Sequence, residues 1–67
     1  MNPELARKIV AEVERKGFGR LTEEEAMKMT RIESDNHIEV YAIQKGDVTY
    51  IAWGGETTKL KVKHLFW

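Results

Sequence analysis

The C-terminal stretch of the chain, residues 58–66, alternates lysine with apolar side chains, and it constrains the fold more than any other segment. Side chains of a β-strand point alternately to opposite faces of a sheet. A strand here would turn an apolar row toward one face and a basic row toward the other. The apolar row is Leu60, Val62 and Phe66, and the basic row is Lys59, Lys61 and Lys63. We therefore expect the chain to end in a strand with one side in the core.

Length and charge limit what such a chain can be. Its 67 residues suffice for a single small domain, residues 1–67, which buries only about 60% of its unfolded surface. Lysine plus arginine and aspartate plus glutamate both number 11, so no overall field steers the protein toward nucleic acid or membranes. Cysteine is absent, which excludes a disulfide framework. No apolar run approaches a membrane span or a signal peptide, so we expect a cytoplasmic protein with no membrane partner.

Two helices are predicted in the first half of the chain. In the first, over about residues 3–16, Asn2 can cap the start, Pro3 suits the first helical position and Gly17 suits the end. The second is expected over about residues 23–32. There Thr22 and Glu25 have the spacing of a capping box.

Three strands are predicted in the second half, over about residues 37–45, 48–53 and 58–66. Gly46 and Asp47 form a good two-residue hairpin turn, which sets Ile43 opposite Tyr50. A longer turn over residues 54–57 would set Trp53 opposite Thr58 and Tyr50 opposite Lys61. The predicted fold is α+β: two N-terminal helices packed on one face of a three-stranded antiparallel meander, in the order ααβββ.

This register predicts the content of both sheet faces. The face expected beneath the helices holds Ile38, Val40, Ala42, Ile51, Trp53, Leu60, Val62 and Phe66. The face expected in solvent holds Tyr41, Ile43, Val48, Tyr50, Lys59, Lys61, Lys63 and Trp67. A slip of one residue would exchange the two faces.

The solvent face is the candidate binding surface, because an exposed apolar patch on a small protein indicates a partner. Its candidate binding residues are Tyr41, Ile43, Tyr50, Lys59, Lys61, Lys63 and Trp67. The favoured function is that of a non-catalytic binding module, a regulator, inhibitor or adaptor, for another protein or a second copy of itself. The alternative is nucleic acid, with bases stacked on the tyrosines and phosphates paired with the lysines. A third interpretation is a plain surface, on which lysines protect an edge strand from aggregation.

Other chemistry is poorly supported by the sequence. Ser34, Asp35 and His37 have the residue types of a nucleophile triad, but neighbours on a loop rarely align for that chemistry, and a turn explains Asp35 better. With His37 and His64 as the two histidines, no zinc-ligand pattern arises. We therefore predict no enzyme activity, no metal, no cofactor and no small-molecule pocket.

Overall fold

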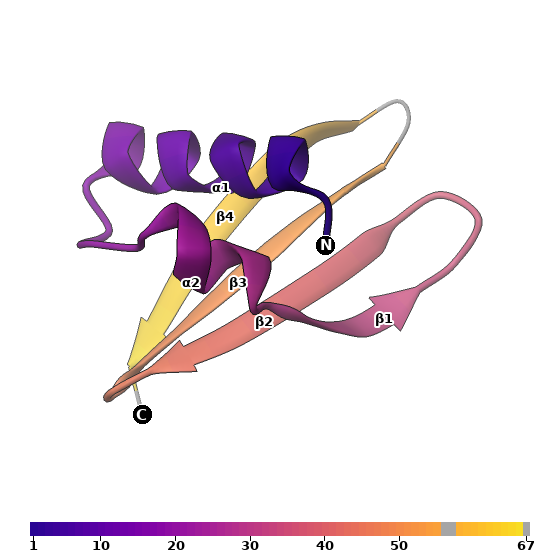
Figure 1. Cartoon of the computed structure of the whole chain (residues 1–67). Coiled ribbons are helices and arrows are strands. Elements are labelled where there is room, and N and C mark those ends of the chain that lie inside the picture. Colours follow the sequence, from indigo (N-terminus) through magenta and orange to yellow (C-terminus); the bar gives the residue numbers. More distant parts are fainter. Residues whose placement is uncertain (56–57, 67) are drawn as a thin grey trace.

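Two helices lie on one side of a four-stranded antiparallel sheet in the computed structural model, which describes residues 1–55 and 58–66 (Figure 1). The strands follow one another in space as they do in the chain, β1-β2-β3-β4. The elements are α1 (Pro3–Lys16), α2 (Glu23–Met27), β1 (Thr30–Ser34), β2 (Glu39–Lys45), β3 (Val48–Gly55) and β4 (Thr58–Phe66). The α+β class is confirmed, but the prediction of three strands is wrong.

Helix α1 begins and ends where local signals predict. The side chain of Asn2 accepts a hydrogen bond from the backbone N–H of Leu5 at 2.7 Å, and Pro3 opens the helix. Gly17 takes the left-handed conformation, with φ 72°, and its N–H donates to the carbonyls of Val13 and Glu14. These contacts satisfy backbone groups that a helix end otherwise leaves unpaired.

Helix α2 starts as predicted but is much shorter. The capping box between Thr22 and Glu25 is present, yet the helix ends at Met27 rather than near residue 32. The residues predicted as its second half instead form β1, which pairs with β2 from Thr30↔Ala42 to Ser34↔Glu39. Every residue of β1 is exposed, so the strand has no buried stripe from which periodicity could identify it. The conformation of β1 depends on backbone pairing with β2, which the propensities of its residues do not reveal.

The β2–β3 hairpin has the predicted register. Lys45 pairs with Val48 across the Gly46-Asp47 turn, and Ile43 pairs with Tyr50. Strand β2 begins at Glu39, two residues later than predicted, because Asp35 and the residues around it form the preceding turn.

The predicted register between β3 and β4 is wrong. Trp53 pairs with Lys61 rather than with Thr58, and Tyr50 pairs with His64 rather than with Lys61. The register shifts between Trp53 and Gly55, which marks a bulge near the hairpin. The offset from the predicted pairs is three residues, an odd number, so β4 faces the opposite way relative to β2 and β3 from what the sequence suggested.

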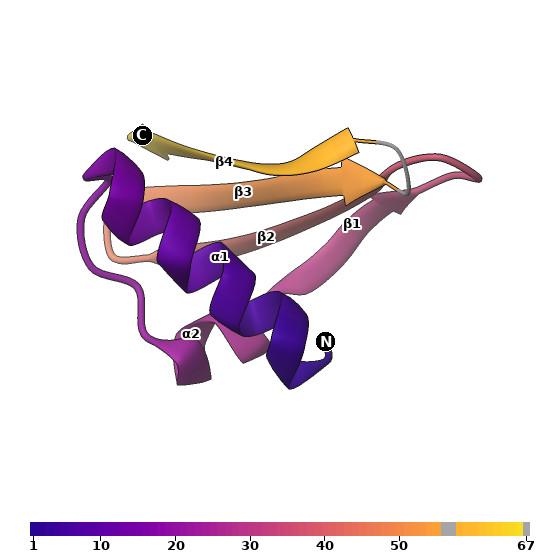
Figure 2. The same cartoon turned by 90° about the horizontal axis from the view of Figure 1, so that it is seen from above.

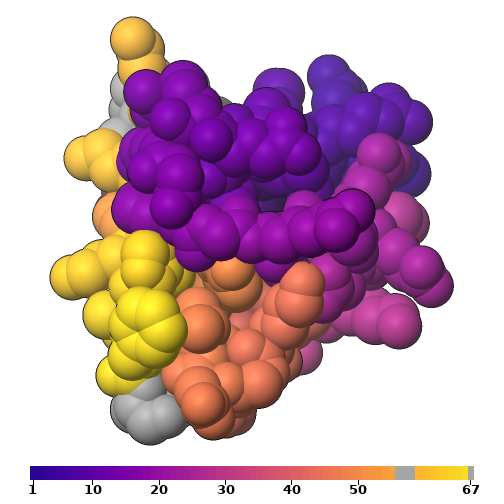
Figure 3. Space-filling view, turned by 90° about the vertical axis from the view of Figure 1, so that its left-hand side faces the viewer, coloured from indigo at the N-terminus to yellow at the C-terminus, as the bar shows by residue number. Residues whose placement is uncertain are grey.

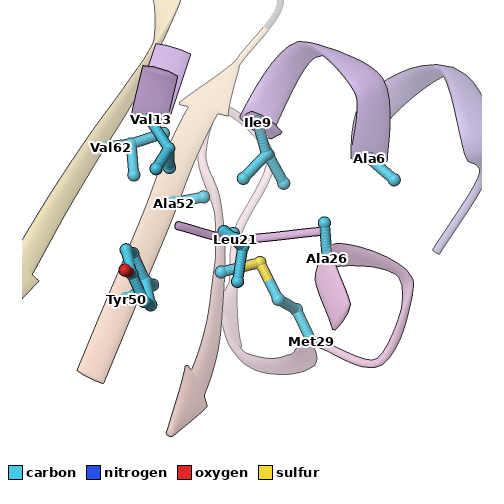
Figure 4. Packing of buried hydrophobic residues seen from close by; sticks show 9 residues of the cluster. All are labelled: Ala6, Ile9, Val13, Leu21, Ala26, Met29, Tyr50, Ala52 and Val62. Carbon is cyan, nitrogen blue, oxygen red and sulfur yellow. The ribbon is translucent and has the colours of Figure 1, made fainter. Parts of the chain in front are cut away.

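The core lies between the helices and the sheet face that carries Tyr50 and Ala52 (Figure 4). Lys45 also lies on this side, where its ammonium donates to the Arg20 carbonyl at 2.7 Å and to Glu25 at 3.0 Å. The buried cluster consists of Ala6, Ile9, Val13, Leu21, Ala26, Met29, Tyr50, Ala52 and Val62. The helices therefore cover the face that was predicted to be exposed on β2 and β3.

Candidate binding surface

The sheet face turned away from the helices carries an apolar patch that crosses three strands. Strand pairing places Val40 beside Trp53, Ala42 beside Ile51 and Thr49 beside Leu65. We call this face the open face, with its apolar patch formed by Val40, Ala42, Ile51, Trp53 and Leu65. All five side chains are partly exposed, and none belongs to the buried cluster or to the side chains packed against it. Figure 1 shows both helices on the other side of the sheet.

The tyrosines and isoleucine of the predicted site lie on the opposite, helix-covered face. Tyr50 is 3% exposed, and Tyr41 and Ile43 pack against the buried cluster. The predicted surface of tyrosines flanked by lysines is therefore wrong. Both faces of the β2–β3 hairpin are apolar, so alternation alone could not tell which one the helices cover. Trp67, also predicted for the site, lies outside the described residues.

The hydroxyl groups of both tyrosines have partners of their own. That of Tyr50 lies 3.3 Å from the Phe18 carbonyl oxygen and 3.5 Å from that of Arg20, in the link between the helices. Tyr41 donates to a carboxylate oxygen of Glu39 at 2.9 Å. Burial and this hydrogen bond to Glu39 raise the pKa of Tyr41 above its ordinary value. The tyrosines thus serve the packing of the fold.

The three lysines of the predicted site are exposed, and strand pairing places two of them, Lys61 and Lys63, on the open face. Lys61 lies directly across from Trp53, and Lys63 directly across from Ile51. Lys59 precedes them on the same strand and is also exposed. In the described part of β1, Glu33 is placed on this face by its pairing with Val40. The open face therefore combines an apolar centre with a predominantly basic margin along β4.

A second basic feature adjoins β4 on the helix side. A groove of about 650 Å³ runs between α1 and β4 and is lined by Lys8, Ala11, Glu12, Arg15, Lys16, Lys59, Leu60 and Lys61. Its carboxylate is already occupied, because Glu12 lies 2.8 Å from Arg15 and 3.8 Å from Lys16. The hydrogen bond from Arg15, reinforced by both positive charges, lowers the pKa of Glu12. We call this feature the basic groove.

The loop between β1 and β2 borders a further groove, of about 450 Å³. The carboxylate of Asp35 accepts hydrogen bonds from the backbone N–H groups of His37 at 2.6 Å and Ile38 at 2.7 Å, which lower its pKa. This is the turn role predicted for Asp35. The groove also touches Lys8, Glu39 and Trp53. The sequence indicated no pocket here.

Three further features bear on function: the grouping of possible metal ligands, the surroundings of His64 and the length of the helices. Within residues 1–55 and 58–66, no three histidine, cysteine, aspartate or glutamate side chains form a group that could hold a metal ion. His64 lies between Phe18 and Phe66, with ring centroids 4.6 and 5.3 Å away, both in edge-to-face geometry. Of the helices in this part of the chain, none is long and apolar enough to cross a membrane.

Comparison of the sequence with protein-family models and curated proteins, and of the fold with solved structures, found no match. Functional arguments for this protein therefore depend on its own residues.

The sequence interpretation missed the apolar patch because it assigned Val40, Ala42, Ile51 and Trp53 to the core. One signal pointed the other way. His64 continues the inward-facing positions of Leu60 and Val62, and its imidazole has an apolar ring body that can lie beside a buried tyrosine. Aligning His64 with Tyr50 gives the observed register.

Proposed function

We propose that this protein is a non-catalytic binding module that docks a protein partner on the open face of its sheet. The observation that carries the proposal is that both sheet faces are apolar while the helices lie on only one of them. A contiguous apolar patch left in solvent by a small protein is the usual mark of an interaction site. Trp53 lies within this patch, and tryptophan is enriched among the residues that dominate binding energy at interfaces.

The positive charge along the β4 side of the apolar patch indicates what kind of surface the partner presents. Lys61 and Lys63 line one side of the patch, so a matching protein would present an apolar centre with acidic residues along one side. A second copy of the chain fits less well. It would bring three more lysines on its own β4 and, in the described residues, only Glu33 as an acid on its open face. Like charges placed opposite one another oppose such a pairing.

The non-catalytic part of the proposal is supported by two carboxylates that could have served as a general base but already have hydrogen-bond partners within the fold. The Asp35 carboxylate is already used by two backbone N–H groups of its own turn. The Glu25 carboxylate is used by Lys45 and by the cap of α2. A general base needs a free acceptor within reach of its substrate.

The test compares patch variants with a matched variant on the helices. Ile51→Thr and Trp53→Thr remove apolar area from the patch and keep strand-compatible side chains, whereas Met27→Thr makes a similar change at an exposed position of α2. A partner isolated with the wild-type protein from its own cells would be purified and titrated against all four proteins by calorimetry. We expect Met27→Thr to bind like wild type and each patch variant to bind at least about fivefold more weakly, as for a central interface residue. A partner that binds both patch variants with unchanged affinity would contradict the proposal.

Single-stranded nucleic acid is a second candidate, favoured by the placement of Trp53 directly across from Lys61. A base stacked on the indole could have its phosphate paired with the lysine. With Trp67 replaced by Phe, Trp53 is the sole tryptophan, and its fluorescence reports an added oligonucleotide. In this candidate, changing Lys59, Lys61 and Lys63 to Gln flattens the salt dependence by about two units. If the oligonucleotide does not quench the fluorescence of Trp53 at low salt, the nucleic-acid candidate is excluded.

A further inference from the structure

The outer edge of β4 is a second surface of this molecule, distinct from the open face. Strand β4 is the last strand of the sheet, and it runs from Thr58 to Phe66. Figure 2 shows it at one margin of the molecule, with α1 crossing the strands beside it. Figure 3 shows its C-terminal half in yellow below the helices, next to the β2–β3 turn. An edge strand of this length offers backbone N–H and C=O groups for pairing with another chain.

The direction of these backbone groups can be assigned residue by residue. The carbonyl oxygen of Val62 accepts a hydrogen bond from the Lys16 ammonium at 3.4 Å, so it points away from β3. Residues of an antiparallel edge strand alternate between bonding to the neighbouring strand and pointing outward. His64 therefore points its N–H and C=O outward like Val62, whereas Lys61 and Lys63 bond inward to β3. The outward pair is available to a new strand once Lys16 releases Val62.

The surroundings of this edge carry positive charge on both sides. On the open face lie the side chains of Lys61 and Lys63. On the helix side the basic groove contributes Lys8, Arg15 and Lys16, and its Glu12 is already paired with Arg15. A strand added here would lie within reach of cations above and below its backbone.

This charge pattern selects against a second copy of the chain. Two β4 strands paired antiparallel with their open faces on the same side would place lysines opposite lysines, because Lys61 and Lys63 both point to the open face. Like charges directly opposite each other destabilise a strand pair. The same pattern favours a strand that carries carboxylates at every second position.

We propose that the outer edge of β4 binds an extended polypeptide segment in which acidic and apolar residues alternate, added antiparallel as a further strand of the sheet. Its apolar residues would lie opposite Val62 and His64, exchange backbone hydrogen bonds with them and contact Phe18 and Phe66 from the helix side. Its acidic residues would lie opposite Lys61 and Lys63, in the closely spaced non-hydrogen-bonded pairs. Backbone bonds supply affinity and alternate side chains supply selectivity in this mode of recognition. The site is independent of the partner proposed for the open face.

The test uses a nine-residue peptide in which glutamate and valine alternate, labelled at one end and titrated against the full chain by fluorescence anisotropy. Two further peptides carry backbone N-methyl groups, one on its valines and the other on its glutamates. Methyl groups on the valines block the N–H groups that face β4, and those on the glutamates point away. We expect the valine-methylated peptide to bind at least tenfold more weakly than the parent and the glutamate-methylated peptide to bind within about threefold of it. Amide exchange at Val62 and His64 should slow on binding.

Charge is tested with matched lysine variants. The double variant Lys61→Gln/Lys63→Gln should bind the parent peptide about threefold to tenfold more weakly, the range expected for two exposed ion pairs. Lys28→Gln, a change to an exposed lysine at the end of α2, should bind like wild type. Equal affinities of the two methylated peptides would overturn the proposal, since binding would then not depend on the N–H groups that face β4. So would an oligonucleotide that binds this edge while the peptide does not, or a peptide that protects no amide of β4.

Discussion

Leucine substitutions at Tyr50 and Trp53, two aromatic residues of β3, test which sheet face the helices cover. Tyr50 and Trp53 lie on opposite faces, and the structure places Tyr50 in the core at 3% exposure and Trp53 on the open face. A sequence-based register reverses these roles. Tyr50→Leu and Trp53→Leu should therefore differ in cost by an amount whose sign identifies the covered face.

The magnitude follows from what each side chain touches. Removing a buried aromatic ring costs about 3 to 5 kcal/mol when alanine replaces it, and leucine recovers part of that loss. The hydroxyl of Tyr50, close to the Phe18 and Arg20 carbonyls, contributes about 1 kcal/mol more. We expect Tyr50→Leu to cost about 3 kcal/mol and Trp53→Leu about 1 kcal/mol. A domain of 67 residues has a total stability of roughly 3 to 10 kcal/mol, so the first change is a large fraction of it.

The assay is thermal and urea unfolding followed by far-ultraviolet circular dichroism, which does not depend on the tryptophan being replaced. A loss of 1 kcal/mol lowers the unfolding midpoint of a domain of this size by about 4 to 8 °C. Tyr50→Phe, which removes only the hydroxyl, is the milder variant if Tyr50→Leu does not fold. If Trp53→Leu were the more destabilising of the two leucine variants, the face assignment would be reversed. The open-face proposal would then lose its basis.

Two further predictions concern the link between the helices and the cap of α2. Gly19 has φ 104°, and a Cβ there would lie 3.2 Å from the Tyr50 hydroxyl, whereas Gly17 has φ 72° with no such neighbour within 4 Å. Each change to Ala costs about 1 to 2 kcal/mol for the backbone alone, so Gly19→Ala should lower the thermal midpoint more than Gly17→Ala, and equal losses would contradict this. The ammonium of Lys45, with the backbone N–H of Thr22, lowers the pKa of Glu25 from 4.5 to about 2. The stabilisation by this carboxylate is therefore complete above about pH 4.5 and is lost as the pH falls toward 2, so the urea midpoint of Glu25→Gln should fall less steeply over this window. Parallel acid profiles for the two proteins would refute it.

Local signals predicted the elements whose ends are fixed by neighbouring residues. The caps at Asn2, Thr22 and Gly17 and the Gly46-Asp47 turn act over a few positions, and each lies where the sequence indicates. Strand β1 was missed because its backbone is paired by β2, which begins five residues farther along the chain. Its own side chains are all exposed and leave no periodic trace.

The candidate surface was harder to predict than the fold because it depends on a single bulge. The bulge between Trp53 and Gly55 shifts the pairing by one residue, from Gly55↔Thr58 to Trp53↔Lys61, and this odd shift changes which strand faces combine. The lysines were recognised as a surface feature of the sheet, but they were matched with tyrosines that the helices cover, and the patch around Trp53 was assigned to the core. Lys61 was expected beside Tyr50 and lies beside Trp53.

The balance of charge also has a different meaning once the chain is folded. A net charge of zero suggested that no anionic partner is attracted. However, the molecule measures 31 × 22 × 19 Å, and charges in physiological salt are screened beyond about 8 Å. Two of the three acids of α2 pair locally, Glu23 with Arg7 and Glu25 with Lys45, so these two do not neutralise β4. A ligand at the edge of β4 therefore experiences the lysines of that strand and of the basic groove, and the neutrality of the whole chain is no argument against an acidic partner there.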